Sequence, residues 1–562
     1  MGSSEDAARY PADGSLSTEG LSGVARSAGV VGGATLASRV LGLVRDVILA
    51  NTFAAAATDT FFIAFMIPNL FRRLVGEGSL TVSFVPIFTG WLQRSREEAR
   101  RVFNAAWTLG AGVGLLITVG GILLAGPLVH LFAPGFALEP GKHELCVTLL
   151  RLCFPYILFL ILVAVAMGAL NAVGHFLAPA IAPVLLNLCL IAAALAASPF
   201  FATPILSLGV AVVLAGILQC ALQVPPLRAR GLTPQPVIAP GHPAMRRLGV
   251  LMAPAVLGAS VFQLNVLVSR LLSSFEGDGA VSYLYYAGRL IEFPLGVFVV
   301  AIGTASLPTF SRLAKTQDRP GLSQAFSGAL GLALALALPS TVGLLLLREP
   351  IFATLFSWNR EVFGEAAVVG CAEALRFYAL GLVPITVSRL YVNLCFAHEN
   401  TRTPARAAVV SLIVNVLASL ALIGPLPWGP LPARFVALQH AWTVADMGFA
   451  GLALAASIAS LANASYLAVA THRLYGSLLG RGELGRWLRL GVAGVALAGA
   501  VWGLQQVLPI PRRASSLGLA LLALHVAVGA GVYLASLYGL RSPELAALRA
   551  TFRRRSALQR GS

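Results

Sequence analysis

The chain has 562 residues, of which 57% are hydrophobic and 11% are charged. Soluble globular proteins carry roughly 45–50% apolar and about 25% charged residues, so this composition excludes a soluble multidomain enzyme, a disordered chain and a coiled coil. The formal net charge is +17. In a chain this apolar, excess arginine is typical of the cytoplasmic loops of a membrane protein. We therefore expect an all-α polytopic membrane protein and no nucleic-acid partner.

Fourteen apolar segments follow one another along the chain, each long enough to cross a bilayer as a helix of about 20 residues. The loops between them are too short for a folded catalytic domain, which argues against a membrane enzyme with a soluble head. The predicted spans lie near residues 24–50, 58–88, 104–126, 146–171, 176–198, 203–224, 247–272, 281–310, 322–347, 368–396, 405–424, 444–470, 486–508 and 515–540.

Basic residues are distributed unevenly between the two sets of loops. With the N-terminus in the cytoplasm, the inside segments hold 25 Lys and Arg and the outside loops hold 6. The remaining 9 basic residues are arginines inside the apolar segments. Because cytoplasmic loops are the ones enriched in positive charge, we predict that both termini are cytoplasmic.

An internal repeat connects the two halves of the chain. Six predicted spans separate the matching segments, so both halves point the same way, as in parallel transporter repeats. The matched pairs, about 225 residues apart, are Arg151 and Arg376, His175 and His398, Pro179 and Pro404, and Asn187 and Asn415. The predicted domains are a cytoplasmic tail (1–23), a six-helix N-lobe (24–240), a six-helix C-lobe (241–480), two further helices (481–540) and a basic cytoplasmic tail (541–562).

Charged residues inside the spans are the candidates for function, because each costs at least about 2.5–3.5 kcal/mol near the bilayer centre. In the first span Arg39 and Asp46 share one helix face, and Arg45 lies at its flank. We expect these arginines to line an aqueous cavity and meet an anion. The alternative is that one of them only forms a structural pair with Asp46.

The second predicted span carries Asp59, Arg72, Arg73 and Glu77, and prolines and glycines interrupt it. Such interruptions predict a bent helix. Arg73 and Glu77 are i,i+4 partners if the helix continues. For Asp59 the sequence leaves open a water-exposed helix N-cap, and for the two arginines an interfacial anchor pair.

The eighth span places Arg289 and Glu292 on one helix face. We expect them to face the same cavity, with a self-contained ion pair as the alternative. Three tyrosines nearby, Tyr283, Tyr285 and Tyr286, fit an outer aromatic belt.

The nine arginines in the spans outnumber the acids that lie deep in them, which are Asp46, Asp59, Glu77 and Glu292. A cavity lined in this way favours anions, and guanidinium forks match phosphate oxygens. Arg270 lies near a span end and is expected to snorkel. No GxxxxGK[ST] loop occurs, so we expect a transporter that does not hydrolyse ATP, rather than an enzyme.

Four stretches resemble the MurJ (MviN) family, the lipid II flippases of bacterial peptidoglycan synthesis. The resemblance covers essentially the whole chain. It implies the fold of the multidrug/oligosaccharidyl-lipid/polysaccharide exporter superfamily, two six-helix lobes in a V, with a lipid-tail groove formed by 481–540. The stretches are SRVLGLVRD (38–46), ATDTFFIAFMIPNLFRRLVGEGSLTVSFVPIF (57–88), YYAGRLIEFPLGVFVVAIGTASLP (285–308) and TRTPAR (401–406).

The resemblance implies that lipid II, an undecaprenyl-diphosphate-linked disaccharide pentapeptide, moves from the inner to the outer leaflet of the cytoplasmic membrane by alternating access. Arg39, Arg45 and Arg289 fall on the family's essential cavity arginines. Other functionally sensitive positions of the family fall on Asp46, Asp59, Arg72, Glu77 and Glu292. Membrane lipids and the cell-wall synthesis machinery are the partners that it implies.

No cofactor or metal site is expected. Some family members bind sodium through acids between the seventh and eleventh spans, where this chain offers only Gln263, Asn265 and Asn415. We therefore expect the membrane potential to drive transport, at about 2.3 kcal/mol per charge per 100 mV.

Four other functions compete with this reading. The nearest is a flippase for another polyprenyl-diphosphate-linked oligosaccharide of the O-antigen type. A drug or cation antiporter would need an acidic cavity, and a membrane enzyme acting on polyprenyl diphosphates would need paired acids. A non-transporting scaffold would leave the deep charges without a purpose.

Overall fold

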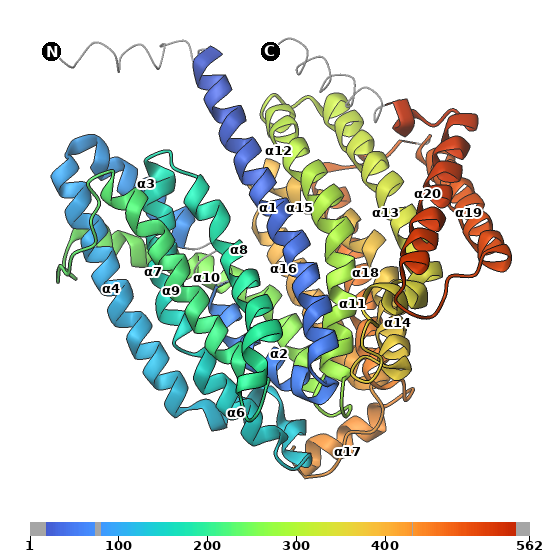
Figure 1. The fold of residues 1–562 in the computed structure, drawn as a ribbon. Helices are drawn as coiled ribbons and strands as arrows, with labels where there is room; N and C mark the ends of the chain where they lie inside the picture. Colours follow the sequence, from blue (N-terminus) through green and yellow to red (C-terminus); the bar gives the residue numbers. More distant parts are fainter. Residues whose placement is uncertain (1–17, 73–79, 430, 481, 547–562) are drawn as a thin grey trace. The chain divides into compact units, whose positions relative to one another are not determined.

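The computed structural model describes residues 18–72, 80–429, 431–480 and 482–546, and their course is drawn in Figure 1. Within them the regular secondary structure is helical, apart from one isolated bridge between Ile423 and Asp446. The contacts divide the chain into two compact units, which are described separately. Unit 1 comprises Met1–Leu49, Ala64–Val129 and Glu144–Ser260, and unit 2 comprises Ala50–Ile63, His130–His143 and Val261–Ser562.

Each predicted span coincides with one helix or with a helix pair, and the short helices α5 and α17 are additions to the prediction. Among the described residues, nine helices are long and apolar enough to cross a membrane, and the bent pair α14–α15 makes a tenth. The all-α membrane fold is confirmed, while the count of fourteen spans stays a prediction. The helices are α1 (Thr18–Thr52), α2 (Ala55–Phe71), α3 (Leu80–Arg94), α4 (Arg96–Leu123), α5 (Ala125–Phe132), η3 (Pro134–Leu138), α6 (Lys142–Cys153), α7 (Tyr156–Ala172), α8 (Leu177–Ala192), η4 (Ala193–Ala197), η5 (Ser198–Phe200), α9 (Leu206–Arg228), α10 (Pro243–Ser273), α11 (Ala280–Pro294), η6 (Leu295–Val299), α12 (Val300–Lys315), α13 (Arg319–Leu355), α14 (Glu365–Leu380), α15 (Leu382–Ala397), α16 (Arg402–Leu422), α17 (Ala433–Trp442), α18 (Gly448–Tyr475), α19 (Glu483–Val507) and α20 (Ser516–Gly539).

Helix α7 is the central helix of unit 1. It is largely buried and packs against α3, α4 and α9. Glycines let α4 approach it closely, since a Cβ added at Gly114 would lie 3.0 Å from the Cα of Leu158. Small residues permit this close packing between membrane helices. On α4, Leu116 and Leu123 are 74% and 73% exposed, and these side chains are available to lipid.

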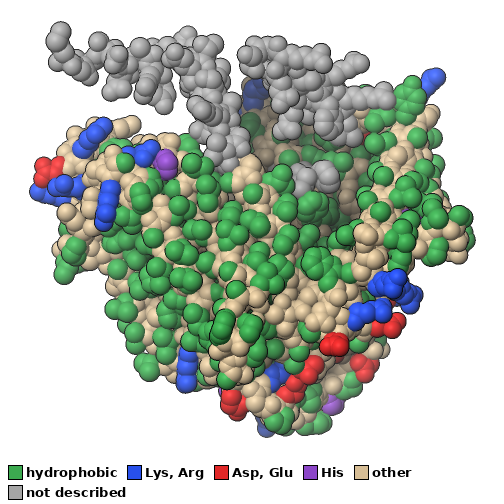
Figure 2. All heavy atoms as spheres, in the orientation of Figure 1, with side chains coloured by type: hydrophobic (Ala, Val, Ile, Leu, Met, Phe, Trp, Pro, Cys, Tyr) green, Lys and Arg blue, Asp and Glu red, His purple; other side chains and the backbone are tan. Residues whose placement is uncertain are grey.

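Hydrophobic side chains also dominate the surface. Figure 2 shows them spread across the visible face, with charged side chains gathered in a few separate groups. Large exposed apolar patches mark contact with a membrane or a partner. In helices the backbone groups bond internally, so a surface of this kind is compatible with lipid.

The internal repeat is visible in the helix boundaries. Helices α7 and α15 end, and α8 and α16 begin, at positions that are 225 residues apart. The turns between them each place one residue at positive φ, Gly174 at 74° and Glu399 at 57°. This equivalence pairs His175 with Asn400, so the predicted match of His175 with His398 is wrong by two residues, and that of Asn187 with Asn415 is wrong by three.

In unit 2, two helices are interrupted within a predicted span. Helix α11 ends at Pro294 and continues through the π-helical turn η6 into α12. Proline removes a backbone hydrogen-bond donor, and the π turn accommodates this defect. Helices α14 and α15 meet at a 40° bend. The residue there is Gly381, where an added Cβ would lie 2.7 Å from Oγ of Ser457 on α18.

Helices α19 and α20 form a hairpin on α13, and a buried ion cluster joins one end of all three. Arg486 donates from Nε to Glu544 at 2.8 Å, and from Nη1 to Glu483 at 3.0 Å and Ser327 at 2.6 Å. Glu544, which follows α20, is 2% exposed. A Cβ added at Gly331 would lie 2.5 Å from Nη2 of Arg486. The cluster therefore fixes the residues after α20 to the hairpin and to α13.

Candidate functional site

Arg45 is the centre of a buried polar group in unit 1. Its side chain is 7% exposed and donates to Oδ1 of Asp46 from Nε at 2.9 Å and from Nη2 at 2.5 Å. Nη1 donates to Oδ1 of Asn187 at 3.0 Å, and Nδ2 of Asn187 donates to the carbonyl of Ser38 at 3.1 Å. The pairing with Asp46 that the sequence left open is present, and Asn187 on α8 is a partner that the sequence did not indicate.

The other predicted cations of unit 1 are placed differently. Arg39 on α1 is exposed. Arg72, directly after α2, is half-buried and donates from Nε to Oδ1 of Asn69 at 2.8 Å. Arg73 and Glu77 lie outside the described residues, so their predicted pairing stays a prediction. Within unit 1, the structure brings Arg45 together with Asp46 and leaves Arg39 at the surface.

Asp59 caps a helix other than its own. Its side chain is fully buried in unit 2. Oδ2 accepts a hydrogen bond from the backbone N–H of Gly279 at 2.7 Å, and Oδ1 accepts from the N–H and the hydroxyl of Ser282 at 2.8 and 2.6 Å. These donors lie at the N-terminus of α11, where unpaired N–H groups favour a carboxylate. The alternative that the sequence left open, a water-exposed N-cap, is therefore wrong.

Lys142 is a residue that sequence reasoning missed. It begins α6 with a side chain that is 5% exposed, and its Nζ lies 3.7 Å from Oδ2 of Asp59. It also lies 2.9 Å from Oε2 of Glu139 and 2.7 Å from Oδ1 of Asp278. Only Glu139 is near Lys142 in sequence. No spacing rule connects the lysine with the other two acids, so the sequence held no signal for this cluster.

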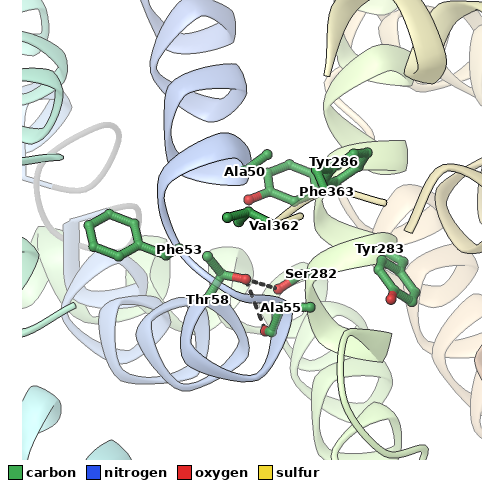
Figure 3. A pocket seen from close by; sticks show the side chains of 9 residues that line it. All are labelled: Ala50, Phe53, Ala55, Thr58, Ser282, Tyr283, Tyr286, Val362 and Phe363. Atoms are coloured by element: carbon green, nitrogen blue, oxygen red, sulfur yellow. Dashed lines mark hydrogen bonds between the residues drawn. The ribbon is translucent and has the colours of Figure 1, made fainter. Parts of the chain in front are cut away.

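A small pocket lies beside the capped end of α11, and Figure 3 shows the hydroxyl of Thr58 turned toward Ser282 there. Tyr286, one of its lining residues, is 1% exposed and packs against Phe363 and Phe62. The predicted position of Tyr286 in an outer aromatic belt is therefore wrong. The pocket is lined by Ala50, Phe53, Ala55, Thr58, Ser282, Tyr283, Tyr286, Val362 and Phe363.

Arg289 and Glu292 form an ion pair on α11, with 2.8 Å between Nη1 and Oε2 and side chains that are 29% and 54% exposed. The Cζ atoms of Arg289 and Arg270 lie 5.9 and 5.8 Å from the ring centroid of Tyr285. Arg270, which the sequence predicts to snorkel, donates to the carbonyl of Val281 at 2.6 Å. Two guanidinium groups thus meet at one tyrosine, and only one of them was predicted as a site residue.

The described residues offer little to a metal ion. No group of three or more His, Cys, Asp or Glu side chains among them could hold one. A sodium site would rest on Asn265 and Asn415, whose Oδ1 atoms are buried with no hydrogen-bond partner in the described part of the chain. Both oxygens are neutral and leave the charge of a cation unbalanced, so these two side chains alone do not fit a sodium ion.

The sequence matches known proteins over most of its length. The family model described as lipid II flippase MurJ matches residues 49–509. A curated lipid II flippase MurJ from Burkholderia cenocepacia is 36% identical over 399 residues, covering 70% of this chain and 77% of that protein. A probable lipid II flippase MurJ from Vibrio cholerae is 33% identical over 485 residues, covering 84% and 87%.

Solved structures share the fold. A lipid II flippase MurJ in an inward closed conformation has a TM-score of 0.72 at 23% identity, covering 90% of this chain and 97% of that one. An inward-facing multidrug resistance MATE family transporter of the MOP superfamily has a TM-score of 0.63 at 14% identity, covering 78% and 95%. The fold thus occurs with different cargoes and does not decide the substrate. The family model and the curated relatives do separate these groups, and by both matches the chain belongs to the MurJ family of lipid II flippases.

Proposed function

We propose that the chain moves lipid II from the inner to the outer leaflet of the bacterial cytoplasmic membrane by alternating access, without hydrolysing ATP. The observation that carries the proposal is the excess of arginine inside the apolar spans, nine against six acids. A diphosphate is the part of lipid II that guanidinium forks match best. The polyprenyl tail can remain in lipid, so only the polar head needs a hydrated path.

In this proposal Arg39, Arg45 and Arg289 bind the diphosphate. Asp46 and Glu292 hold two of these arginines while phosphate is absent, which the ion pairs Arg45–Asp46 and Arg289–Glu292 support. Release on the outer side requires that the two states of the protein bind the head group differently. A carboxylate that exchanges with phosphate supplies such a difference.

The other predicted site residues have supporting roles. Arg72 and Glu77, from the second span, complete the basic and acidic lining. Asp59 acts through α11, because it holds the first turn of the helix that carries Arg289. Arg270 joins the site because its guanidinium lies against the same tyrosine as that of Arg289.

The same proposal includes the domain plan and the energy source. The N-lobe (24–240) and the C-lobe (241–480) alternate, the helices of 481–540 hold the lipid tail, and both termini are cytoplasmic. The orientation is supported by 25 basic residues on the inside against 6 on the outside. The membrane potential drives the cycle through the charged site, and the cell-wall synthesis machinery takes up the product.

The test is to deplete a bacterium of its own flippase while supplying this chain, and to score growth and lipid II in the outer leaflet. We expect rescue by the unchanged protein and none by Arg39→Ala or Arg289→Ala at equal membrane expression. Arg376→Ala is the control, since that side chain is 52% exposed and pairs only weakly, at 3.4 Å, with Glu373. Rescue by both site variants would overturn the site assignment.

Failure of the unchanged, membrane-inserted protein would overturn the proposed substrate. It would favour another polyprenyl-diphosphate-linked oligosaccharide, such as an O-antigen unit. Replacing sodium by choline in the same cells should leave the outer-leaflet signal unchanged, whereas an uncoupler that collapses the membrane potential should abolish it.

A further inference from the structure

We propose that Lys142 is a positioning residue for transport, and that its ammonium group holds shut a latch which the protein must open once in each cycle. The Lys142 latch consists of Asp59, Glu139, Lys142, Asp278 and Ser282. The inference rests on the proposed alternation between two states. It adds a residue that lies in none of the sequence motifs.

Three carboxylates from separate segments converge on the one ammonium group. They are Asp278 between α10 and α11, Glu139 before α6, and Asp59 on α2, at 2.7, 2.9 and 3.7 Å from Nζ. Lys142 is 5% exposed and Asp59 is fully buried. Lys142 is the cation that forms ion pairs with all three of these acids, and Arg270 also interacts electrostatically with Asp59. Without it, the fully buried Asp59 would face two further negative charges, Glu139 and Asp278, whose side chains are 33% and 58% exposed.

The latch is tied to the backbone as well as to side chains. The N–H of Gly135 donates to Oγ of Ser274 at 3.0 Å, and a Cβ at Gly135 would overlap the carbonyl of Ser274. The segment that leads into Lys142 therefore lies directly against the end of α10. Separating these two segments would break the glycine contact and the Lys142–Asp278 pair together.

The latch also reaches the first turn of α11. Asp59, beside Lys142, accepts three hydrogen bonds from Gly279 and Ser282, and the hydroxyl of Thr58 lies 2.8 Å from that of Ser282. Arg289 lies seven residues further along α11, about 10 Å at 1.5 Å per residue. A helix transmits displacement of its first turn along its length, so opening the latch would shift Arg289.

The latch joins segments from both halves of the chain. Asp59 and Lys142 belong to the predicted N-lobe, and Asp278 and Ser282 to the predicted C-lobe, yet all four lie in one compact unit. If the two lobes move apart during transport, these ion pairs are contacts that must break. Each charged group would then gain water, which makes the step reversible.

The experiment uses a thiol reporter behind the latch. Ala50 is 3% exposed and lines the pocket beside Ser282 (Figure 3). In a variant lacking the six native cysteines, Ala50→Cys is labelled in intact cells with a membrane-impermeant maleimide, and flipping of lipid II is scored in parallel. We expect Lys142→Met to raise the labelling rate at least tenfold and to lower flipping. Lys142→Arg, which keeps the charge, should restore both.

Lys315→Met is the matched control, since Lys315 is the only other lysine of the chain and is exposed; it should change neither readout. If Lys142→Met fails to reach the membrane, Asp278→Asn and Glu139→Gln each remove one partner and should raise labelling by a smaller factor. Labelling at the unchanged rate in every membrane-inserted variant would overturn the proposal. Faster labelling without any flipping by the parent chain would leave the latch standing and overturn the proposed substrate.

Discussion

Arg45 and Asp46 are consecutive residues of α1 that form a buried ion pair, with 2.5 Å between Nη2 and Oδ1. Consecutive residues do not face each other on a helix, so the arginine has to turn back along the helix surface to meet this carboxylate. Asn187 accepts from its third nitrogen at 3.0 Å. The guanidinium is thus held in place by protein partners, and under the proposed function a phosphate would compete with Asp46 for it.

Replacing Asp46 by Asn should therefore impair both stability and flipping. Removal of one partner leaves the other charge buried and unbalanced, which costs about 3–5 kcal/mol in known cases. Chemical denaturation of the purified protein and the outer-leaflet lipid II assay give the two measurements. Glu97→Gln is the control, because the Arg101–Glu97 pair is 59% and 65% exposed and such pairs contribute at most about 1 kcal/mol. Normal flipping by Asp46→Asn would show that Asp46 does not compete with phosphate.

Glu292→Gln should separate the effect on flipping from the effect on stability. Its pair with Arg289 is solvent-accessible, so the free energy of unfolding should change by no more than about 1 kcal/mol. If Glu292 displaces phosphate from Arg289, the variant should bind a soluble diphosphate more tightly and flip lipid II more slowly. Affinity and flipping rate that both match the unchanged protein would contradict this role.

Two adjacent glycines of α4 allow a test of helix packing. A Cβ added at Gly121 would overlap the ring of Phe154, whereas one added at Gly120 would meet nothing within 4 Å. Gly121→Ala should therefore lower the free energy of unfolding by about 1–3 kcal/mol, as overpacking does. Gly120→Ala should be neutral or slightly stabilising. Equal unfolding temperatures for the two variants in detergent would refute the packing of α4 against α6–α7.

The stability of the protein should depend on pH through Glu276, in the loop between α10 and α11. Burial, together with repulsion from Asp446, raises the pKa of Glu276 from 4.5 to about 7. Because the folded protein disfavours the ionised form, the free energy of unfolding should fall as pH rises from about 4.5 through 7. Unfolding temperatures between pH 5 and 8 measure this effect.

Two variants make the assignment to Glu276 specific. Glu276→Gln should remove this part of the pH dependence. Asp446→Asn, which removes the neighbouring charge, should lower the pKa of Glu276 in the folded protein, so that the fall in stability becomes smaller and ends at a lower pH. If the unfolding temperature of Glu276→Gln depends on pH as strongly as that of the unchanged protein, the pH dependence belongs to another group.

The positions of the helices could be predicted because lipid imposes a length of about 20 apolar residues on each span. This length rule does not predict how far a helix continues outside the bilayer. The predicted span 322–347 is therefore shorter than α13, which contains it. The bend at Gly381 could not be predicted from the sequence either. It depends on the close approach of Ser457, from a helix that begins more than sixty residues later.

The charged residues of the candidate site could be predicted from the sequence, but the side chains that bond to them could not. Arg45, Asp46 and Arg289 stand out because charge is costly inside an apolar segment. Asn187 and Lys142 carry no such signal, since a single asparagine or a loop lysine is ordinary at those positions. The role of Asp59 as a cap of α11 could not be predicted, because this helix begins more than two hundred residues later in the sequence.

The ion cluster at Arg486 sets a limit on how the chain can be shortened or tagged. Helix α20 ends at Gly539, but Glu544 beyond it is the carboxylate that meets Nε of Arg486. A cut or a fusion junction placed directly after the last helix would remove that carboxylate and leave Arg486 with Glu483 and Ser327. The usable boundary for truncations and reporter fusions therefore falls after Glu544, and not at the end of α20.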